Sequence, residues 1–242
     1  MMDRFDGTRR HAMRAGLALV GLGLVLPSGG FAAEKKGKGP GQEKEVGAVE
    51  DLMREHGVLR RALLVYREAA TKLRAGGGTT AAALNRTAKL FRSFGEDYHE
   101  KKLEEAHIFP ALRKTKGPAA AYPDMLTKQH DRGREITTYI LSVTRRGGLG
   151  SGDVETLSHA LETFVTMYQN HAAREDTIVF PAWKTAISQR QLTELGEKFE
   201  QIEKQQFGSD GYEDAVKQIA DIEQMLGLSD LAQFTPRPPP KS

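Results

Sequence analysis

The chain has 242 residues, 39% of them hydrophobic, which is enough for one well-packed domain with extensions but not for two large domains. The formal charge is only +3, and without the first 33 residues the balance is 31 basic to 30 acidic side chains, so no nucleic-acid partner is indicated. Because there is no cysteine, disulfides and thiolate ligands are excluded, and any bound metal must rely on imidazole, carboxylate and water, which favours iron, manganese or zinc.

The first 33 residues have the pattern of an export signal. A basic start precedes an apolar run from Ala15 to Leu26, and small residues at 30–33 follow as at a cleavage site. The apolar run is shorter than a bilayer-spanning helix requires. Arg9 and Arg10 also fit a twin-arginine signal, and an ordinary secretory signal with two chance arginines fits equally well. We therefore expect a periplasmic protein with no membrane association after the signal is cleaved.

Residues 34–46 consist mainly of Lys, Glu, Gly and Pro, and we expect a flexible tether there. Apolar residues then recur at helical spacing from Val46 to Arg74, and the three glycines 76–78 end the pattern. A second helix is expected from about Thr80 to Leu112, before the Gly117-Pro118 break. The first two helices are therefore joined by a short glycine-rich loop.

A third helix is expected to begin near Pro123 and to end at Arg145 and Arg146, where basic side chains meet the negative end of the helix dipole. A fourth helix is expected from Asp153 to about Ile187. Proline follows phenylalanine near the ends of the second and fourth helices, at positions 110 and 181. Each proline is expected to kink its helix or to end it.

Four amphipathic helices joined by short loops predict an all-α fold, an up-down antiparallel four-helix bundle over residues 47–187. Two further helices are expected at 188–207 and 210–226, and they form a C-terminal extension (188–227) packed on the outside of the bundle. The Pro-rich tail, residues 228–242, is expected to be extended or disordered.

Two segments, one in the second and one in the fourth predicted helix, repeat the same pattern. Each begins with a histidine, His99 or His171, continues through two adjacent carboxylates and closes on Phe-Pro. Another histidine precedes each of them, His56 by 43 residues and His130 by 41 residues. A single His/Glu pair four residues apart is more often a solvated pair than a ligand pair, but here each bundle helix holds a histidine. Because di-metal sites are built from inward-pointing Glu and His in bundle cores, the repetition favours a metal site.

Four motifs stand out between about Val46 and Lys184: Glu55-His56-x-x-Leu-Arg60, His99-x4-Glu104-Glu105-x3-Phe-Pro, Gln129-His130-x-x-Gly-Arg134 and His171-x3-Glu175-Asp176-x3-Phe-Pro. Together they resemble the hemerythrin-like, or HHE cation-binding, family. The resemblance implies a four-helix bundle with a non-haem di-iron centre bridged by two carboxylates and an oxygen species. Carried onto this sequence, it implies imidazole ligands at His56, His99, His130 and His171 and bridging carboxylates at Glu104 and Glu175.

One departure from the family concerns the third helix. Oxygen-carrying members have two histidines a turn apart there, whereas the residue four positions after His130 is Arg134. A cation at this position must point away from the metals or pair with an acidic neighbour. The departure disfavours plain oxygen carriage and favours a site completed by water or an extra carboxylate, with Glu55 and Glu100 as the nearest candidates.

A second departure concerns the second helix, which has one residue more than the fourth between its histidine and Phe-Pro. His99 and Glu104 are five positions apart, which is about 140° on a regular helix, and Leu103 occupies the position four after His99. Either a π-bulge brings Glu104 into line, since such bulges gather at functional sites, or Glu100 supplies the carboxylate. We prefer Glu104.

The other candidates have simpler interpretations. His107 lies at a helix end, where packing is favoured over a role as a fifth imidazole ligand, and His159 lies too far along the fourth helix for the same centre. Glu105 and Asp176 are expected to be solvated partners, with Asp176 kept as a reserve ligand. The tyrosines and the tryptophan are expected in the core or at its rim.

The leading hypothesis is an exported hemerythrin-like protein that binds two iron ions, with zinc or manganese as alternatives. An open position would bind O2, NO or peroxide, for binding, sensing or iron holding, and Tyr98 or Tyr168 could hydrogen-bond an oxygen species if it lined the pocket. The first alternative is a di-iron peroxidase or NO-handling enzyme assisted by Arg134, although no nucleophile or substrate pocket can be read from the sequence. The second is a helical interaction module without a functional metal, whose protein partner the sequence does not identify.

Overall fold

The computed structural model describes residues 46–76, 80–145, 149–150 and 152–240. Every regular element among these residues is helical and none is a strand, which confirms the predicted all-α class. The predicted signal at 1–33 lies outside the described residues, and so does the predicted tether apart from its last residue. In the described part of the chain, no helix combines the length and the apolar character needed to cross a membrane.

The first two predicted helices are present within two residues of their expected bounds. The helix α1 spans Ala48–Arg74. The helix α2 (Thr80–Leu90) continues without a break into the π-helical segment η1 (Phe91–Ile108), and η1 continues into α3 (Phe109–Arg113). The predicted second helix is therefore one continuous element whose hydrogen bonding changes twice.

The third and fourth predicted helices are also present. A 3-10 turn, η2 (Pro118–Ala121), leads into α4 (Tyr122–Thr144). The helix α5 (Asp153–Arg174) continues through a short π-helical segment, η3 (Glu175–Val179), into α6 (Phe180–Ala186). Both elements with a Phe-Pro pair therefore contain a π-helical segment directly before it.

Neither Pro110 nor Pro181 ends its helix, which corrects one of the two outcomes expected from the sequence. Each proline is at the first or second position of an α-helical segment, where a backbone N–H is not required. The residue before it still donates its N–H five positions back, from Phe109 to the carbonyl of Glu104 and from Phe180 to that of Glu175. The chain continues because the hydrogen bonding changes from π to α at the point where the proline N–H is missing.

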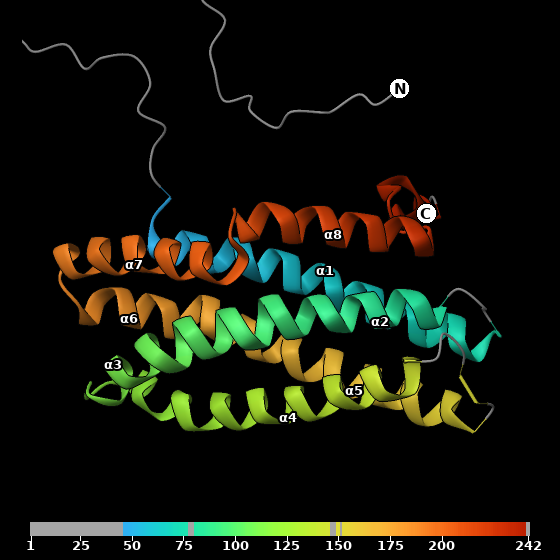
Figure 1. Ribbon diagram of the computed structural model, residues 1–242, viewed down its shortest axis with the longest axis horizontal. Helices are drawn as coiled ribbons and strands as arrows, with labels where there is room; N and C mark the ends of the chain where they lie inside the picture. The colour runs from blue at the N-terminus through green and yellow to red at the C-terminus, as the bar shows by residue number, and fades with distance from the viewer. Residues whose placement is uncertain (1–45, 77–79, 146–148, 151, 241–242) are drawn as a thin grey trace, which may run out of the picture. The chain divides into compact units, whose positions relative to one another are not determined.

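The central helices pack in a closed ring. The helix α1 contacts α5, α5 contacts α4, α4 contacts α2 and η1, and α2 contacts α1. Figure 1 shows these helices running alongside one another. Their shared interior holds fully buried aromatic side chains, among them Phe164, whose ring meets those of Tyr66 and Phe91 edge-on at 5.3 and 5.0 Å. This packing is compatible with the predicted four-helix arrangement.

The two predicted C-terminal helices are α7 (Gln189–Phe207) and α8 (Gly211–Leu226). The helix α8 packs along α1 and α2, and α7 packs along α1 and η1 (Figure 1). Arg61 of α1 donates two hydrogen bonds to Glu223 of α8, at 2.8 and 2.5 Å. After α8 only a single turn, η4 (Leu231–Phe234), is regular, and residues 235–240 have no regular structure, as expected for the tail.

At the contact between α7 and α8, the carboxylate of Glu203 destabilises the fold when it is charged. Glu203 accepts a hydrogen bond from the Tyr212 N–H at 2.7 Å, but burial outweighs that bond and raises the pKa of Glu203 from 4.5 to about 7. A carboxyl whose pKa is raised by folding stabilises the fold at low pH, and this contribution is lost as the pH rises from about 4.5 to about 7. We therefore expect Glu203→Gln, which keeps an accepting oxygen, to stabilise the protein at pH 8.

The expected gain at pH 8 is about 1 kcal/mol, because the shift must be discounted for the partial exposure of the side chain. Thermal unfolding of the variant and the unchanged protein at pH 8 and pH 4.5 measures it, with an expected Tm increase of about 2–4 °C at the higher pH alone. Glu200→Gln, at an exposed position of the same helix, is the matched control. An equal Tm change at both pH values would contradict the prediction.

Candidate metal centre

The four histidines predicted as ligands come from four different elements and meet in the interior. His56 lies on α1, His99 on η1, His130 on α4 and His171 on α5, and each is at most 3% exposed. The rings form two pairs, with centroids 4.7 Å apart for His56 and His99 and 4.8 Å apart for His130 and His171. The structure therefore brings all four imidazoles to one place.

The π-helical segment η1 explains how Glu104 joins His99 across a spacing of five residues. Hydrogen bonds in a π-helix connect residues five apart, so residues i and i+5 lie on the same side. Glu104 Oε1 lies 3.4 Å from His99 Nε2, and its Oε2 lies 3.4 Å from His130 Nε2. The π-helical alternative therefore describes this helix correctly, although it extends over 18 residues and is not a single bulge.

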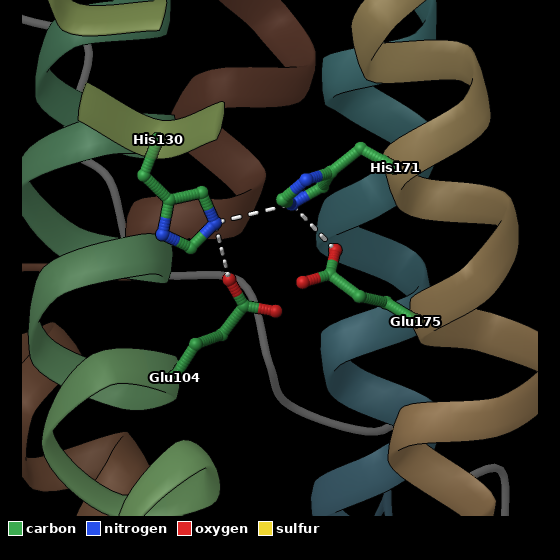
Figure 2. A group of neighbouring side chains, drawn as sticks. All are labelled: Glu104, His130, His171 and Glu175. Carbon is green, nitrogen blue, oxygen red and sulfur yellow. Dashed lines mark hydrogen bonds and ion pairs between the residues drawn. The ribbon is translucent and has the colours of Figure 1, made fainter. Parts of the chain in front are cut away.

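Glu175 has the corresponding place on the other side of the centre. Its Oε2 lies 3.0 Å from His171 Nε2 and 3.5 Å from His56 Nε2. Figure 2 shows Glu104 and Glu175 pointing toward each other beneath His130 and His171, whose Nε2 atoms are 3.1 Å apart. Each carboxylate therefore lies between one histidine of the first pair and one histidine of the second.

The centre contains buried polar atoms that form no hydrogen bond in the described chain, although imidazole nitrogens lie 3.0–3.5 Å from three of the four carboxylate oxygens. His99 Nε2 and both oxygens of Glu104 and of Glu175 have no hydrogen-bond partner. An unsatisfied buried polar group costs about 1–3 kcal/mol, so five such atoms at one place are expensive for a purely structural core. Metal ions would supply the missing partners, and imidazole with carboxylate suits iron, manganese and zinc.

The ligand atoms fall into two overlapping groups within which all lie less than 4.8 Å apart. One group is formed by Glu104, His130, His171 and Glu175, and the other by His56, His99 and Glu104. Glu104 belongs to both. The residues are therefore compatible with two ions that share Glu104, whereas the sequence resemblance implied two shared carboxylates, Glu104 and Glu175.

The Nδ1 atom of each of the four histidines of the centre is held by an oxygen on a neighbouring helix. The pairs are His56 with Asp176 at 2.7 Å, His99 with Glu55 at 2.5 Å, His130 with Glu105 at 2.8 Å and His171 with Gln129 at 2.9 Å. A partner on Nδ1 sets the tautomer and the ring orientation, and it raises the basicity of Nε2. All four Nε2 atoms are thereby directed at the two carboxylates.

These partners repeat the duplication seen in the sequence. The first two bundle helices form one half of the duplication and the last two form the other. In each half, the residue before the first histidine contacts the second histidine, so Glu55 contacts His99 and Gln129 contacts His171. One half therefore has a carboxylate at this position and the other a neutral amide. Glu55 also accepts a hydrogen bond from the Tyr98 hydroxyl at 2.9 Å, so it lies behind His99, and the expectation that it completes the metal site was wrong.

The residue after each of the two predicted bridging carboxylates, Glu104 and Glu175, holds a histidine of the opposite half. Glu105 holds His130, and Asp176 holds His56. Neither is the simple solvated partner that was expected, and the reserve role of Asp176 as a ligand does not fit its contact with Nδ1. The adjacent carboxylates in both repeats were the signal that could have identified these residues, because both members recur at the same place.

The two arginines that follow the first histidine of each half by four residues reinforce these contacts. Arg60 pairs with Asp176, and Arg134 pairs with Glu105. Arg134 also contacts Glu100 Oε2 at 3.1 Å. The sequence left two alternatives for Arg134, to point away from the metals or to pair with an acidic neighbour. The structure shows the pairing. Glu100 is held by Arg134 and by Tyr168, whereas Glu104 lies between His99 and His130, which favours Glu104 as the carboxylate of the second helix.

A small cavity adjoins the centre between α1, η1 and α5. Its volume is about 10 Å³, which is room for about one water-sized molecule. It is lined by five of the six predicted ligands, by the apolar Leu59, Leu63, Phe91 and Ala172, and by the polar Arg60, Glu100 and Tyr168. His130 is the predicted ligand that is not part of this lining.

The electrostatics of the centre are those of closely paired acids and bases. Burial opposes charging of the imidazoles, but Glu104 and Glu55 nevertheless raise the pKa of His99 well above its usual value. Burial likewise opposes ionisation of Glu175, but His171 and His56 hold the pKa of that carboxyl well below its usual range. Because metal ligands must be deprotonated imidazoles and carboxylates, binding of a metal at this centre would release protons.

The two other histidines in the described part of the chain lie outside the centre. His107 is partly buried and packs near Phe199, with ring centroids 5.7 Å apart, and His159 is exposed on α5. Of the two tyrosines considered as pocket residues, Tyr168 lines the cavity, whereas Tyr98 contacts Glu55 behind His99. These positions agree with the packing expected for His107 and with the expectation that His159 lies away from the centre, and they single out Tyr168.

Comparison with known proteins gives one family and several relatives. The model of the hemerythrin HHE cation binding domain matches residues 47–183, which contain all four histidines and both carboxylates of the centre. The uncharacterized proteins Rv1995 of Mycobacterium tuberculosis (strain H37Rv) and Mb2018 of Mycobacterium bovis are each 39% identical over 234 residues, which cover 94% of this chain and 91% of theirs. No solved structure matches the chain significantly. The chain therefore belongs to the hemerythrin HHE cation-binding domain family.

Proposed function

We propose that this chain is an exported hemerythrin-like protein that holds a non-haem di-iron centre within an up-down four-helix bundle. Its function is to bind or sense a small ligand such as O2, NO or peroxide, or to hold iron, and zinc or manganese are the alternative metals. The observation that carries the proposal is the convergence of four imidazole Nε2 atoms on two carboxylates whose oxygens are buried and unsatisfied.

In this proposal one ion is held by His56, His99 and Glu104, and the other by Glu104, His130, His171 and Glu175. A bound iron pair supplies redox chemistry and an open coordination position. The chain contributes the rest: four oriented imidazoles, two carboxylates between them, and apolar walls that limit access of solvent. The cavity of about 10 Å³ beside the centre has room for about one water-sized molecule, which restricts the proposed ligand to the smallest molecules.

The enzymatic alternative has less support. A di-iron peroxidase or NO-handling enzyme was considered because Arg134 was expected near the metals, where it would stabilise developing negative charge. Arg134 instead makes ion pairs with Glu100, Glu105 and Asp131, and it does not line the cavity. Because Arg134 does not supply a free cation to the cavity, small-ligand binding is the better-supported function.

Metal content tests the proposal. Mass spectrometry of protein purified from its native compartment is expected to find two iron ions per chain, and His56→Ala with His171→Ala is expected to remove them. Binding to the folded state alone contributes about 4 kcal/mol per ion at a thousandfold excess over Kd, so loss of both ions is expected to lower the Tm by at least about 10 °C.

The matched control is His107→Ala with His159→Ala, which removes two histidines outside the centre and is expected to leave the metal content unchanged. Absence of stoichiometric metal, together with an unchanged Tm in the His56→Ala, His171→Ala variant, would favour the metal-free interaction module instead. Recovery of zinc or manganese at two ions per chain would keep the site and change the metal.

Export is the part of the proposal that rests on sequence pattern alone. The basic start and apolar run within residues 1–33 support a periplasmic location. Cell fractionation of the full chain tests it, and Arg9→Lys with Arg10→Lys separates the two export routes. Retention of this variant in the cytoplasm would indicate the twin-arginine route, whereas unchanged export would indicate an ordinary secretory signal.

A further inference from the structure

One buried carboxylate at the cavity is explained neither by metal binding nor by orientation of a histidine. Glu100 follows His99 on η1, is 2% exposed and lines the cavity. Glu100 also lies near Glu105 and His130 in a third group of ligand-type side chains, but the guanidinium of Arg134 contacts both carboxylates. In that third group the guanidinium of Arg134 therefore already supplies the positive charge that a metal ion would bring.

The hydrogen bonds of Glu100 fix what it presents to a ligand. The Tyr168 hydroxyl donates to Glu100 Oε1 at 2.6 Å, and Arg134 donates to Oε2 at 3.1 Å. A carboxylate has about four lone-pair sites, so two donors leave it with free acceptor positions. Since the Tyr168 hydroxyl has its hydrogen on Glu100, its oxygen also remains an acceptor. We call these two side chains, Glu100 and Tyr168, the acceptor wall.

In the proposed metal-bound centre the imidazoles of the lining are ligands, which leaves Arg60 as the other side-chain donor of the lining besides Tyr168. Leu59, Leu63, Phe91 and Ala172 are apolar. Arg60 is the other charged residue of the lining besides Glu100 and the ligands, but its side chain is 44% exposed and its guanidinium pairs with Asp176. A ligand inside the cavity therefore meets acceptors on its polar side.

The acceptor wall is built into the packing. A Cβ atom at position 133 would lie 2.1 Å from the Tyr168 hydroxyl, so Tyr168 can reach Glu100 only because residue 133 on α4 is glycine. Glu100 is tied to α4 by Arg134 and to α5 by Tyr168. Its position is therefore determined by three helical elements.

We propose that the acceptor wall makes the cavity selective for a small ligand that carries its own hydrogen-bond donor, such as hydrogen peroxide or water. Ligands that only accept, such as O2, NO and the azide ion, gain no hydrogen bond from it, and an anion is also repelled by the Glu100 carboxylate. Hydrogen bonds to a charged group are the stronger ones, which favours the donor-bearing ligand. This inference rests on the proposed metal centre and names the ligand class of that same site.

The test uses the full chain loaded with iron and azide as the probe, followed by visible absorption. Glu100→Gln removes the negative charge and introduces an amide donor, so azide is expected to bind about tenfold more tightly than to the unchanged protein. Hydrogen peroxide, added as a competitor, is expected to displace azide from this variant only at about tenfold or more higher concentration. The iron content of each sample is measured alongside.

The matched control is Glu96→Gln. Glu96 is a fully buried carboxylate one turn earlier on η1, but it contacts Arg92 at 2.9 Å and does not line the cavity, so azide affinity is expected to stay unchanged. Tyr168→Phe provides a second variant, which is expected to change azide affinity in the opposite direction to Glu100→Gln. It removes a donor from Glu100 and leaves the charge more available, so azide is expected to bind about threefold more weakly.

Unchanged azide affinity in Glu100→Gln with both irons present would overturn the acceptor wall while leaving the metal centre intact. Tighter azide binding in Tyr168→Phe would overturn it equally. Failure of the proposed function has a different signature, the absence of iron from the unchanged protein, and it would overturn this inference as well. Opposite changes in the two variants, with the Glu96→Gln control unchanged, would establish it.

Discussion

Replacement of Glu104 with alanine is expected to abolish binding of both metal ions. Glu104 is the residue common to the two groups of ligand atoms, with one oxygen 3.4 Å from His99 and the other 3.4 Å from His130. Removal of the Glu104 side chain takes a ligand from each of the two proposed metal ions. It also removes negative charge that would offset the charge of two cations in a buried site. We expect less than about a tenth of the metal content of the unchanged protein.

The neighbouring residue gives a matched comparison. Glu105 also contacts a histidine of the centre, but through Nδ1 of His130 at 2.8 Å and not through Nε2. Loss of such an orienting partner costs about 10–100-fold in metal affinity and leaves the ligands in place. Glu105→Ala is therefore expected to keep two ions at saturating metal and to release them more readily to a chelator.

Mass spectrometry of metal content, followed by titration with a chelator, distinguishes the two variants. If Glu104→Ala retained two ions, the assignment of Glu104 as a ligand shared by both ions would be wrong. If it lost one ion and kept the other, two independent sites would replace the bridged pair. An identical loss in both variants would mean that Glu105 is itself a ligand, against its contact with Nδ1.

Replacement of Gly133 with alanine is expected to destabilise the protein by about 2–3 kcal/mol. The added Cβ would lie 2.1 Å from the Tyr168 hydroxyl oxygen and 2.8 Å from the ring carbon that bears it. Tyr168 is buried and packs against Phe91 and Phe164 at 4.9 and 4.6 Å, so it cannot move without disturbing the aromatic core. Overpacking therefore outweighs the higher helix propensity of alanine.

Thermal unfolding measures this effect, with an expected decrease in Tm of about 5–10 °C. Gly57→Ala on α1 is the matched control, because a Cβ there meets nothing within 4 Å. The control is expected to stabilise the protein by up to about 1 kcal/mol through helix propensity alone. A Gly133→Ala variant as stable as Gly57→Ala would show that α4 and Tyr168 are not in tight contact.

The helix bounds were predictable because they depend on local pattern. Apolar spacing and glycine breaks placed α1 within two residues, and they placed the element from Thr80 to Arg113 within one residue. The exceptions were Pro110 and Pro181, which were expected to kink or end their helices. Neither ends its helix, because a π-helical segment precedes each proline, and a single residue type does not reveal that change of hydrogen bonding.

The six candidate ligands were also proposed from the sequence, because the repeated histidine-to-Phe-Pro segments resemble the motifs of a known family, and that resemblance implied the ligand set. Their partners on Nδ1 were not. Asp176 and His56 are 120 residues apart, and Glu55 and His99 are 44 residues apart, so their contacts exist only once the helices pack side by side. Sequence reasoning accordingly placed Glu55 among the ligand candidates and Asp176 among solvated residues.

The amino-acid sequence by itself determined the helical class, the helix bounds and the repeated set of histidines and carboxylates, because each is specified by spacing along one chain. Tertiary structure alone decided which oxygen holds each imidazole, where Arg134 is neutralised and what lines the cavity. Those features depend on side chains from different helices meeting at distances of 2.5 to 3.5 Å, and helical periodicity does not specify such contacts.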